Sequence, residues 1–242
     1  IVQADLQPSD LSADTRVVVL PAALPNLLEL LAAAPQTQFV VFSQVDLLAA
    51  GNLSVIRQRV ENQVFLAGFI SVLLSPDWRA AGLLPADGPL GAGLQEAYIN
   101  GGRYYCGVCA PGWPMGMVYP QAALLPASSD GASWQAAAAG LFDSQKAEAY
   151  YLSAAAARPE VYAYLLGRDQ FNRRLLLVGD QSPPEELREQ WAATVGFDAL
   201  EPLRQVWPNL LAGQGGAVLE APLVLKDVNL ANLGKGRMRL VE

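Results

Sequence analysis

The chain has 242 residues, of which 52% are hydrophobic and 16% are charged, and it contains no histidine. This composition predicts one large domain or two smaller ones with a substantial core, and it excludes a disordered chain. The 16 lysine and arginine residues stand against 23 aspartate and glutamate residues, a net charge of −7, and they form no basic cluster, which argues against nucleic-acid binding. The lack of histidine excludes Ser-His-Asp catalysis and histidine metal sites.

The first third of the chain alternates apolar runs with polar turns. Residues 16–20, 39–42 and 54–60 are runs typical of strands in a parallel sheet that is covered on both faces. A helix is predicted between Pro25, which suits a first helical turn, and Pro35, which stops the helix.

The uncharged stretch 64–74 is predicted to be a helix that is apolar on every side. Such a helix must be covered on every side, so it belongs in a large core. Gly68 within it costs roughly 1 kcal/mol relative to alanine, which favours the close approach of a neighbouring backbone. The uncharged run 62–76 is shorter than the roughly 20 residues that a membrane-spanning helix needs. Residues 60–62 are the expected crossing from one packed unit to another.

The middle of the chain continues this alternation. A strand is predicted at residues 80–84, followed by Asp87 as the cap of a helix with Pro89 at its first position. Asn100-Gly101-Gly102 is expected to end that helix. Residues 133–142 are predicted to form an alanine-rich helix.

The last hundred residues repeat the pattern. Strands are predicted at residues 147–152, 175–178 and 192–197. The Ser-x-x-Glu spacing of residues 182–185 has the form of a capping box, and Asp198 repeats that logic before the next helix. Further elements are expected at residues 1–6 (strand), 203–210 (helix), 221–227 (strand) and from Lys235 onward (helix).

Repeated alternation of strand, polar loop and helix predicts an α/β fold with parallel sheets and right-handed crossovers. In such sheets ligands bind beyond the carboxyl ends of the strands, where helix N-termini point inward. The candidate ligand-binding residues are therefore the polar side chains that follow the strands: Ser43, Asp46, Asp87, Ser153, Arg158, Asp180 and Gln181.

Several of these residues have a structural alternative. Asp180 either accepts hydrogen bonds from ligand hydroxyl groups or caps the helix expected after Ser182. Asp87 either reaches the ligand or caps its own helix. Arg158 either binds a carboxylate or phosphate or is an ordinary exposed residue at a helix start. Trp134 is a candidate for stacking on a ligand ring, with a place in the core as the alternative.

Cys106 and Cys109 have the CxxC spacing of redox sites. Such a site needs a helix that begins at the first cysteine, and Pro111 and Pro114 forbid that helix. Two cysteines cannot form a four-cysteine zinc site. Two interpretations stay open, namely a local disulfide in an exported protein or two spare thiols. Neither a cofactor nor a metal is expected.

Several blocks, in chain order, resemble the basic membrane protein family, the purine-nucleoside-binding lipoproteins of ABC importers. Phe65-Leu66-Ala67-Gly68, within residues 52–75, resembles the Phe-Leu-Ala-Gly helix of that family. The later matching blocks are a glycine-rich strand end with a proline-started helix at 82–102, a strand with a small-residue loop at 147–161, and the Asp-Gln strand end at 178–181. The likeness covers most of the chain.

The resemblance implies a type I periplasmic-binding fold: two α/β lobes, each a parallel sheet flanked by helices, that hinge near residue 61 and hold a ligand between them. It assigns residues 1–61 to lobe one, 62–181 to lobe two, 182–216 to a return to lobe one, and 217–242 to a crossover back. It also implies that Asp180 is a ribose-binding carboxylate and that the chain starts at the second strand of the family.

The residues and the resemblance together predict an extracytoplasmic solute-binding lipoprotein, not an enzyme. It would act as a monomer, bind a small, nucleoside-like ligand, and deliver it to an ABC permease. Its lipid anchor would lie outside this chain. The alternative is a ligand-sensing or regulatory domain of the same fold with a degenerate pocket. That alternative gains weight because the family's base-stacking ring and its lysine have no counterpart at residues 127–131 and 194–198.

Overall fold

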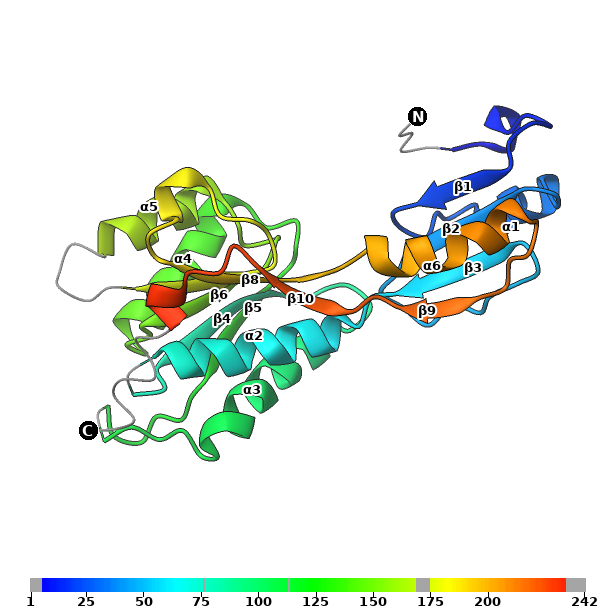
Figure 1. Cartoon of the computed structure of the whole chain (residues 1–242). Helices are drawn as coiled ribbons and strands as arrows, with labels where there is room; N and C mark the ends of the chain where they lie inside the picture. Colours follow the sequence, from blue (N-terminus) through cyan, green and yellow to red (C-terminus); the bar gives the residue numbers. More distant parts are fainter. Residues whose placement is uncertain (1–5, 76, 113, 169–174, 234–242) are drawn as a thin grey trace. The chain divides into compact units, whose positions relative to one another are not determined.

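A computed structural model describes residues 6–75, 77–112, 114–168 and 175–233 (Figure 1). The chain divides into two compact units. Unit 1 comprises residues 1–59 and 197–223, and unit 2 comprises residues 60–196 and 224–242. The strand expected at residues 1–6 lies almost entirely outside the described residues, and so does the whole helix expected from Lys235.

Unit 1 is a four-stranded sheet in the order β1-β2-β3-β9, and all of its strand pairs are parallel. One face is covered by α1, whose Leu27 and Leu30 pack on Phe39 and Val41. The opposite face is covered by α6. The elements of unit 1 are η1 (Pro8–Asp10), β1 (Val17–Leu20), α1 (Leu27–Ala33), β2 (Gln38–Ser43), β3 (Leu53–Arg57), α6 (Leu200–Leu211) and β9 (Val218–Glu220).

Unit 2 is a six-stranded sheet in the order β10-β8-β7-β6-β4-β5. Its pairs β8/β7, β7/β6, β6/β4 and β4/β5 are parallel. The elements of unit 2 are α2 (Val60–Leu74), β4 (Ala80–Pro85), α3 (Gly93–Cys106), β5 (Gln121–Leu125), α4 (Gly131–Asp143), β6 (Ala149–Leu152), α5 (Pro159–Arg168), β7 (Leu176–Gly179), η3 (Glu185–Leu187), β8 (Trp191–Phe197) and β10 (Leu223–Lys226).

Helices α4 and α5 cover one face of the unit 2 sheet, and α2 and α3 cover the other (Figure 1). The first face contains the main core, in which Trp134 and Leu141 of α4 pack on Tyr150 and Leu177 of the sheet. Because both faces are covered, the four central strands β4, β6, β7 and β8 are buried almost throughout, as their continuous apolar runs predicted, whereas the edge strands β5 and β10 are only partly covered.

Helices α2 and α3 lie so close together that glycine is required at their contact. A Cβ atom at Gly68 would overlap the backbone oxygen of Tyr98, and one at Gly101 would overlap the backbone oxygen of Phe65. The close backbone approach predicted at Gly68 is therefore confirmed. The expected helix end at residues 100–102 is wrong, because Gly101 and Gly102 serve this packing and α3 continues to Cys106.

The crossings between the units differ from the expected boundaries. Residues 182–196 were expected in lobe one, whereas β8 pairs with β7 and the crossing falls between Gly196 and Phe197. The last crossing was expected at about residue 217 and falls between Leu223 and Val224, because β9 pairs with β3. An apolar run predicts a strand but not the sheet that the strand joins.

Of the two expected capping boxes, one is absent and the other forms only in part, because the Asp198 backbone N–H donates to the Pro222 oxygen and not to Glu201. Ser182 does not cap a helix, because only the short η3 forms there, with Pro184 at its N-cap and no side-chain cap. Asp198 does act as expected at the start of α6, where its Oδ1 accepts hydrogen bonds from the backbone N–H groups of Leu200 (2.9 Å) and Glu201 (3.2 Å).

Candidate functional site

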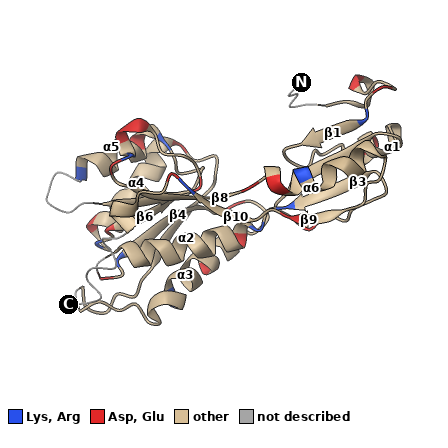
Figure 2. Ribbon diagram, viewed as in Figure 1, with Lys and Arg blue, Asp and Glu red and all other residues tan. Residues whose placement is uncertain are grey.

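Charged side chains are nearly excluded from the strands of both sheets (Figure 2). Within the described strands they occur only at the last position, as Arg57 of β3, Glu220 of β9 and Lys226 of β10. The charged residues of the strands therefore all lie at the carboxyl ends, where parallel α/β sheets bind ligands.

In unit 1, Ser43 at the end of β2 shapes the turn that follows. Its hydroxyl group donates a hydrogen bond to the backbone oxygen of Val45 (2.8 Å) and accepts one from the Val45 backbone N–H (3.2 Å). Ser43 is buried. Its hydrogen-bonding capacity is therefore used within this turn, which presents the next residue, Asp46, to solvent.

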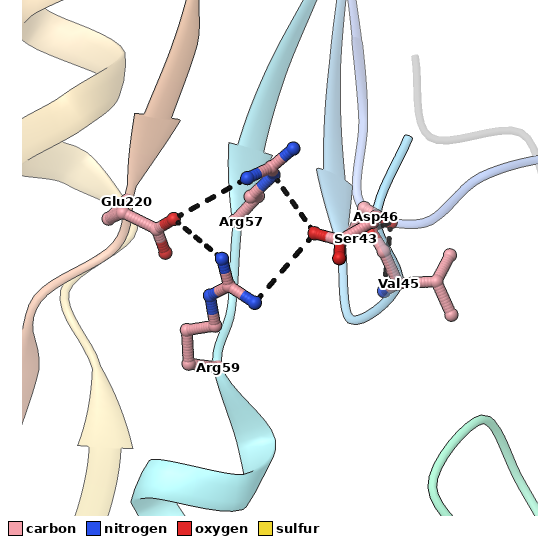
Figure 3. Close-up of polar contacts among 6 residues, drawn as sticks. All are labelled: Ser43, Val45, Asp46, Arg57, Arg59 and Glu220. Atoms are coloured by element: carbon pink, nitrogen blue, oxygen red, sulfur yellow. Dashed lines mark hydrogen bonds and ion pairs between the residues drawn. The ribbon is translucent and has the colours of Figure 1, made fainter. Parts of the chain in front are cut away.

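Asp46 belongs to a ring of four alternating charges with Arg57, Arg59 and Glu220, which we call the unit 1 charge ring (Figure 3). Asp46 Oδ1 lies 3.4 Å from Nε of Arg57 and 3.7 Å from Nη1 of Arg59. Glu220 Oε1 lies 3.9 Å from Nη1 of Arg57 and 3.3 Å from Nη2 of Arg59. The ring links the ends of β3 and β9 to the turn after β2.

Sequence reasoning selected Asp46 but missed Arg57, Arg59 and Glu220. The signal was present in the sequence, because a charged residue that ends an otherwise apolar strand stands at the sheet edge. The partnership of Glu220 with β3 could not be predicted, because it depends on the pairing of β9 with β3 across a long stretch of chain.

In unit 2, Asp180 follows β7, and its carboxyl group is largely buried. Burial raises the pKa of Asp180 to about 6, while the backbone N–H groups of Ala154 and Asp180 and the Tyr151 hydroxyl act in the opposite direction. Oδ2 accepts a long hydrogen bond of 3.4 Å from Tyr151, and Oδ1 is buried without a hydrogen bond of normal geometry to any described residue. The charged form is therefore poorly stabilised.

Ser153 lies next to Asp180 along the same sheet edge. Leu152 of β6 is paired in register with Gly179 of β7, so the residues that follow, Ser153 and Asp180, leave neighbouring central strands. Ser153 is 4% exposed, and its hydroxyl group has no hydrogen-bond partner among the described residues. Together these residues present two buried polar atoms whose hydrogen-bonding capacity is unused.

Asp87 and Arg158 both bond to the backbone of one residue, Ala127, in the loop after β5. Asp87 Oδ1 accepts a hydrogen bond from the Ala127 backbone N–H (2.7 Å), and Arg158 Nη2 lies 3.5 Å from the Ala127 oxygen. Arg158 also donates from Nε to the Ala155 oxygen (3.0 Å). The prediction that Asp87 caps a helix is wrong, because α3 begins only at Gly93, and both side chains instead fasten loops at the sheet edge.

The two remaining candidates of unit 2 lie in opposite environments. Trp134 is completely buried in the core, so its ring offers no face to a ligand, and the alternative of a core role is the correct one. Gln181 is exposed beside Asp180, and its backbone oxygen accepts a hydrogen bond from the Thr194 hydroxyl (3.3 Å).

Cys106 and Cys109 are bonded to each other, with their Cα atoms 5.1 Å apart. They lie at the C-terminal end of α3. Helices in this arrangement run back from the carboxyl ends of the strands, so the disulfide belongs to the opposite edge of the sheet. The described residues contain no cluster of three or more side chains suited to hold a metal ion and no helix long and apolar enough to cross a membrane.

No protein-family model matches the sequence, and no curated protein matches it. Solved structures do match in fold. An ABC transporter solute-binding protein from Aeropyrum pernix K1 has a TM-score of 0.63 at 13% identity, over 87% of this chain and 60% of that one. One from Conexibacter woesei DSM 14684 has a TM-score of 0.65 at 14% identity, over 93% of this chain and 77% of that one.

A LacI-family transcriptional regulator from Enterococcus faecium with bound ribose also matches, with a TM-score of 0.54 at 16% identity, over 87% of this chain and 78% of that one. The chain spans only 60% of the length of the Aeropyrum protein. Identities this low reflect the fold alone. The predicted α/β class, with parallel sheets flanked by helices, is confirmed, and the chain has a fold like that of type I periplasmic-binding proteins.

Proposed function

We propose that the protein is the extracytoplasmic solute-binding component of an ABC importer and binds a small, nucleoside-like ligand at the carboxyl ends of its parallel strands. The Asp180 carboxyl group supports this most directly. It is largely buried, its pKa is raised to about 6, and neither its Oδ1 nor Ser153 Oγ makes a hydrogen bond of normal geometry to a described residue. A buried polar atom without a partner is costly, and a ligand rich in hydroxyl groups would supply the partner.

The chemistry of this edge suits the sugar part of a nucleoside. A carboxylate accepts hydrogen bonds from neighbouring hydroxyl groups, and the Ser153 hydroxyl both donates and accepts. Once water is excluded, such charge-assisted hydrogen bonds become stronger. The similar fold of ABC solute-binding proteins and of a ribose-bound regulator agrees with a small polar ligand.

The remaining parts of the proposal follow from the same role. The protein would act as a monomer that presents its ligand to an ABC permease, and a lipid anchor outside this chain would hold it at the membrane. No step requires a catalytic base, which is consistent with a chain that lacks histidine.

A ligand-sensing regulatory domain is the second candidate, because LacI-family regulators also match this fold, at lower TM-scores than the two solute-binding proteins. The sequence of the complete gene would separate the two functions. A lipoprotein signal that ends at a cysteine supports the importer, and an attached DNA-binding or signalling domain supports the regulator.

Binding is tested by a thermal-shift screen of nucleosides, sugars and amino acids, followed by calorimetric titration of the compounds that stabilise the protein. We expect Asp180→Asn to weaken binding of the best ligand at least tenfold at pH 7.5, and Ser153→Ala to weaken it less. Glu186→Gln is the control, because it also removes one negative charge but does so at an exposed side chain close in sequence to Asp180. The absence of any stabilising compound at millimolar concentration, or full affinity in Asp180→Asn, would contradict the proposal.

A further inference from the structure

The backbone beneath the unit 1 charge ring is fixed on both sides. The backbone N–H of Gln58 donates to the Ser43 oxygen (2.8 Å), and the N–H of Ala221 donates to the Arg57 oxygen (2.8 Å). Arg57 and Arg59 are two residues apart in the sequence. Figure 3 shows both guanidinium groups between Asp46 and Glu220. Two guanidinium groups are thus presented side by side from a rigid sheet edge.

The carboxylates hold these guanidinium groups loosely. Asp46 and Glu220 each contact both arginines through a single oxygen, at distances of 3.3–3.9 Å. Charge-assisted hydrogen bonds are typically about 2.7–2.9 Å long, and arginine pairs most strongly when two parallel hydrogen bonds form. No contact in the ring reaches that geometry, so a better-placed anion could replace one of the carboxylates.

Of the two carboxylates, that of Asp46 is the more easily displaced by an anion. Its side chain is 70% exposed, whereas that of Arg57 is 24% exposed. Nε of Arg57 is buried and makes no hydrogen bond to a described residue, and Asp46 Oδ1 is 3.4 Å away. Exposed ion pairs contribute little to stability, so moving the Asp46 side chain into solvent costs little, while Arg57 stays partly desolvated.

We propose that Arg57 and Arg59 of unit 1 bind an anionic solute through its carboxylate or phosphate group, and that the Asp46 carboxylate competes with this group for the two guanidinium groups. This inference rests on the proposed function, because it names a chemical class for the solute. Within the ring, displacement of Asp46 leaves two guanidinium groups opposite a single carboxylate, that of Glu220. A phosphate or carboxylate also matches the planar guanidinium fork.

A purely structural role for the ring makes a different prediction. If the ring only connects the ends of β3 and β9 to the turn, then Asp46→Asn costs a little stability and leaves anion binding unchanged. If Asp46 competes with the anion, then Asp46→Asn strengthens anion binding, by up to about fivefold for an exposed pair of this kind.

The experiment compares matched neutral and anionic probes: ribose with ribose 5-phosphate, and galactose with galacturonate. The ¹H–¹⁵N NMR signals of the arginine Nε–H groups report contact directly, and calorimetry gives the affinity. We expect the anionic member of at least one pair to bind more tightly and to shift the Arg57 and Arg59 signals. The two pairs separate a phosphate preference from a carboxylate preference.

Three variants complete the test. Asp46→Asn should bind the anionic probe up to about fivefold more tightly, and Arg59→Gln should lose most of the anionic preference. Arg57→Lys keeps the charge at the less exposed position and should bind the anion more weakly, because it lacks the planar fork. Glu29→Gln, an exposed change in α1 of unit 1, controls for net charge. Urea unfolding of each variant verifies that it is folded.

Equal binding of the neutral and anionic probes would overturn the inference, and so would an Asp46→Asn variant that binds the anion no better than Glu29→Gln does. A response to neutral ligands alone overturns this inference and leaves the proposed function intact. The absence of any ligand response overturns both.

Discussion

The hydroxyl group of Tyr151, on β6, donates a hydrogen bond of 3.4 Å to Oδ2 of Asp180, at the end of the adjacent strand β7. A hydrogen bond from a hydroxyl to a carboxylate is typically about 2.5–2.7 Å long, so this one is weak. The pKa of Tyr151 is raised by burial first and by the Asp180 charge second. Both groups are held where their charged forms are disfavoured, and perturbed pKa values cluster at functional sites.

The Asp180 carboxyl group should make the protein less stable as the pH rises. Its pKa is raised from 3.8 to about 6, so the folded state holds this proton more tightly than the unfolded state does. Its stabilising effect is complete below about pH 4 and is lost as the pH rises to about 6. Asp180→Asn should therefore be more stable than the wild type at pH 7, by up to about 3 kcal/mol, and should gain nothing at pH 4.

Urea unfolding of both proteins at pH 4, 5, 6 and 7 measures this difference. Glu186→Gln serves as the control, because that side chain is exposed, and its stability difference from the wild type should not follow the same curve. A difference between Asp180→Asn and the wild type that stays constant from pH 4 to pH 7 would show that the Asp180 pKa is not raised.

The contact of α2 with α3 should tolerate no side chain at its glycines. In Gly68→Ala the new Cβ would overlap the Tyr98 backbone oxygen, so the helices must move apart, and we expect a loss of roughly 2–4 kcal/mol. Gly140→Ala is the matched control, because Gly140 lies in the exposed part of α4 with no atom near its added Cβ. That change should stabilise the protein by about 0.5–1 kcal/mol. Similar effects of the two substitutions would contradict the packing described.

Local sequence signals predicted most of the strands and the α/β class, because apolar runs that end in turn residues mark buried parallel strands. The uncharged segment 64–74 was likewise assigned to a buried helix, which α2 is. The same signals failed where tertiary contacts decide the outcome. Gly101 and Gly102 look like a helix end in the sequence, yet they are interior residues of α3 that face α2 and Pro120.

The candidate site shows the same division. The polar residues after β2, β6 and β7 were predicted from their positions alone, and Ser153 and Asp180 do lie at neighbouring strand ends. The partners of Asp46 were not predicted, because Glu220 reaches the ring only through the pairing of β9 with β3. Asp87 was assigned to a helix cap because the sequence cannot reveal that it bonds Ala127 in a distant loop.

Trp134 should behave as a core residue. It is fully buried among Leu141, Tyr150 and Leu165, so Trp134→Ala should cost about 3–5 kcal/mol in unfolding free energy. Trp207, which is 39% exposed on α6, is the matched control, and Trp207→Ala should cost much less. Urea unfolding measures both losses. A loss of ligand affinity in Trp134→Phe without a loss of stability would instead indicate a stacking role.

The ion pair between Arg79 and Glu148 should stabilise unit 2 only while both partners are present. The Nη2–Oε1 distance is 2.7 Å, and the two side chains are 9% and 12% exposed. Both residues precede strands, so the pair lies at the edge opposite the candidate site. Removing Arg79 leaves the Glu148 carboxylate buried and unpaired, so Arg79→Met should cost about 3–5 kcal/mol. Glu148→Gln should cost less, because Asp77 Oδ2, 3.3 Å from Nη2 of Arg79, still pairs with the guanidinium group.

The double variant Arg79→Met/Glu148→Leu decides whether this loss comes from the unpaired charge. We expect it to recover much of the stability, because replacing a buried ion pair with apolar side chains of similar volume is often nearly neutral. The exposed pair Arg188–Glu185, whose side chains are 66% and 79% exposed, provides the control, and Arg188→Ala should cost less than about 1 kcal/mol. If the losses in unfolding free energy were additive in the double variant, each side chain would stabilise unit 2 through separate contacts. Ligand affinity should stay unchanged in every variant that folds.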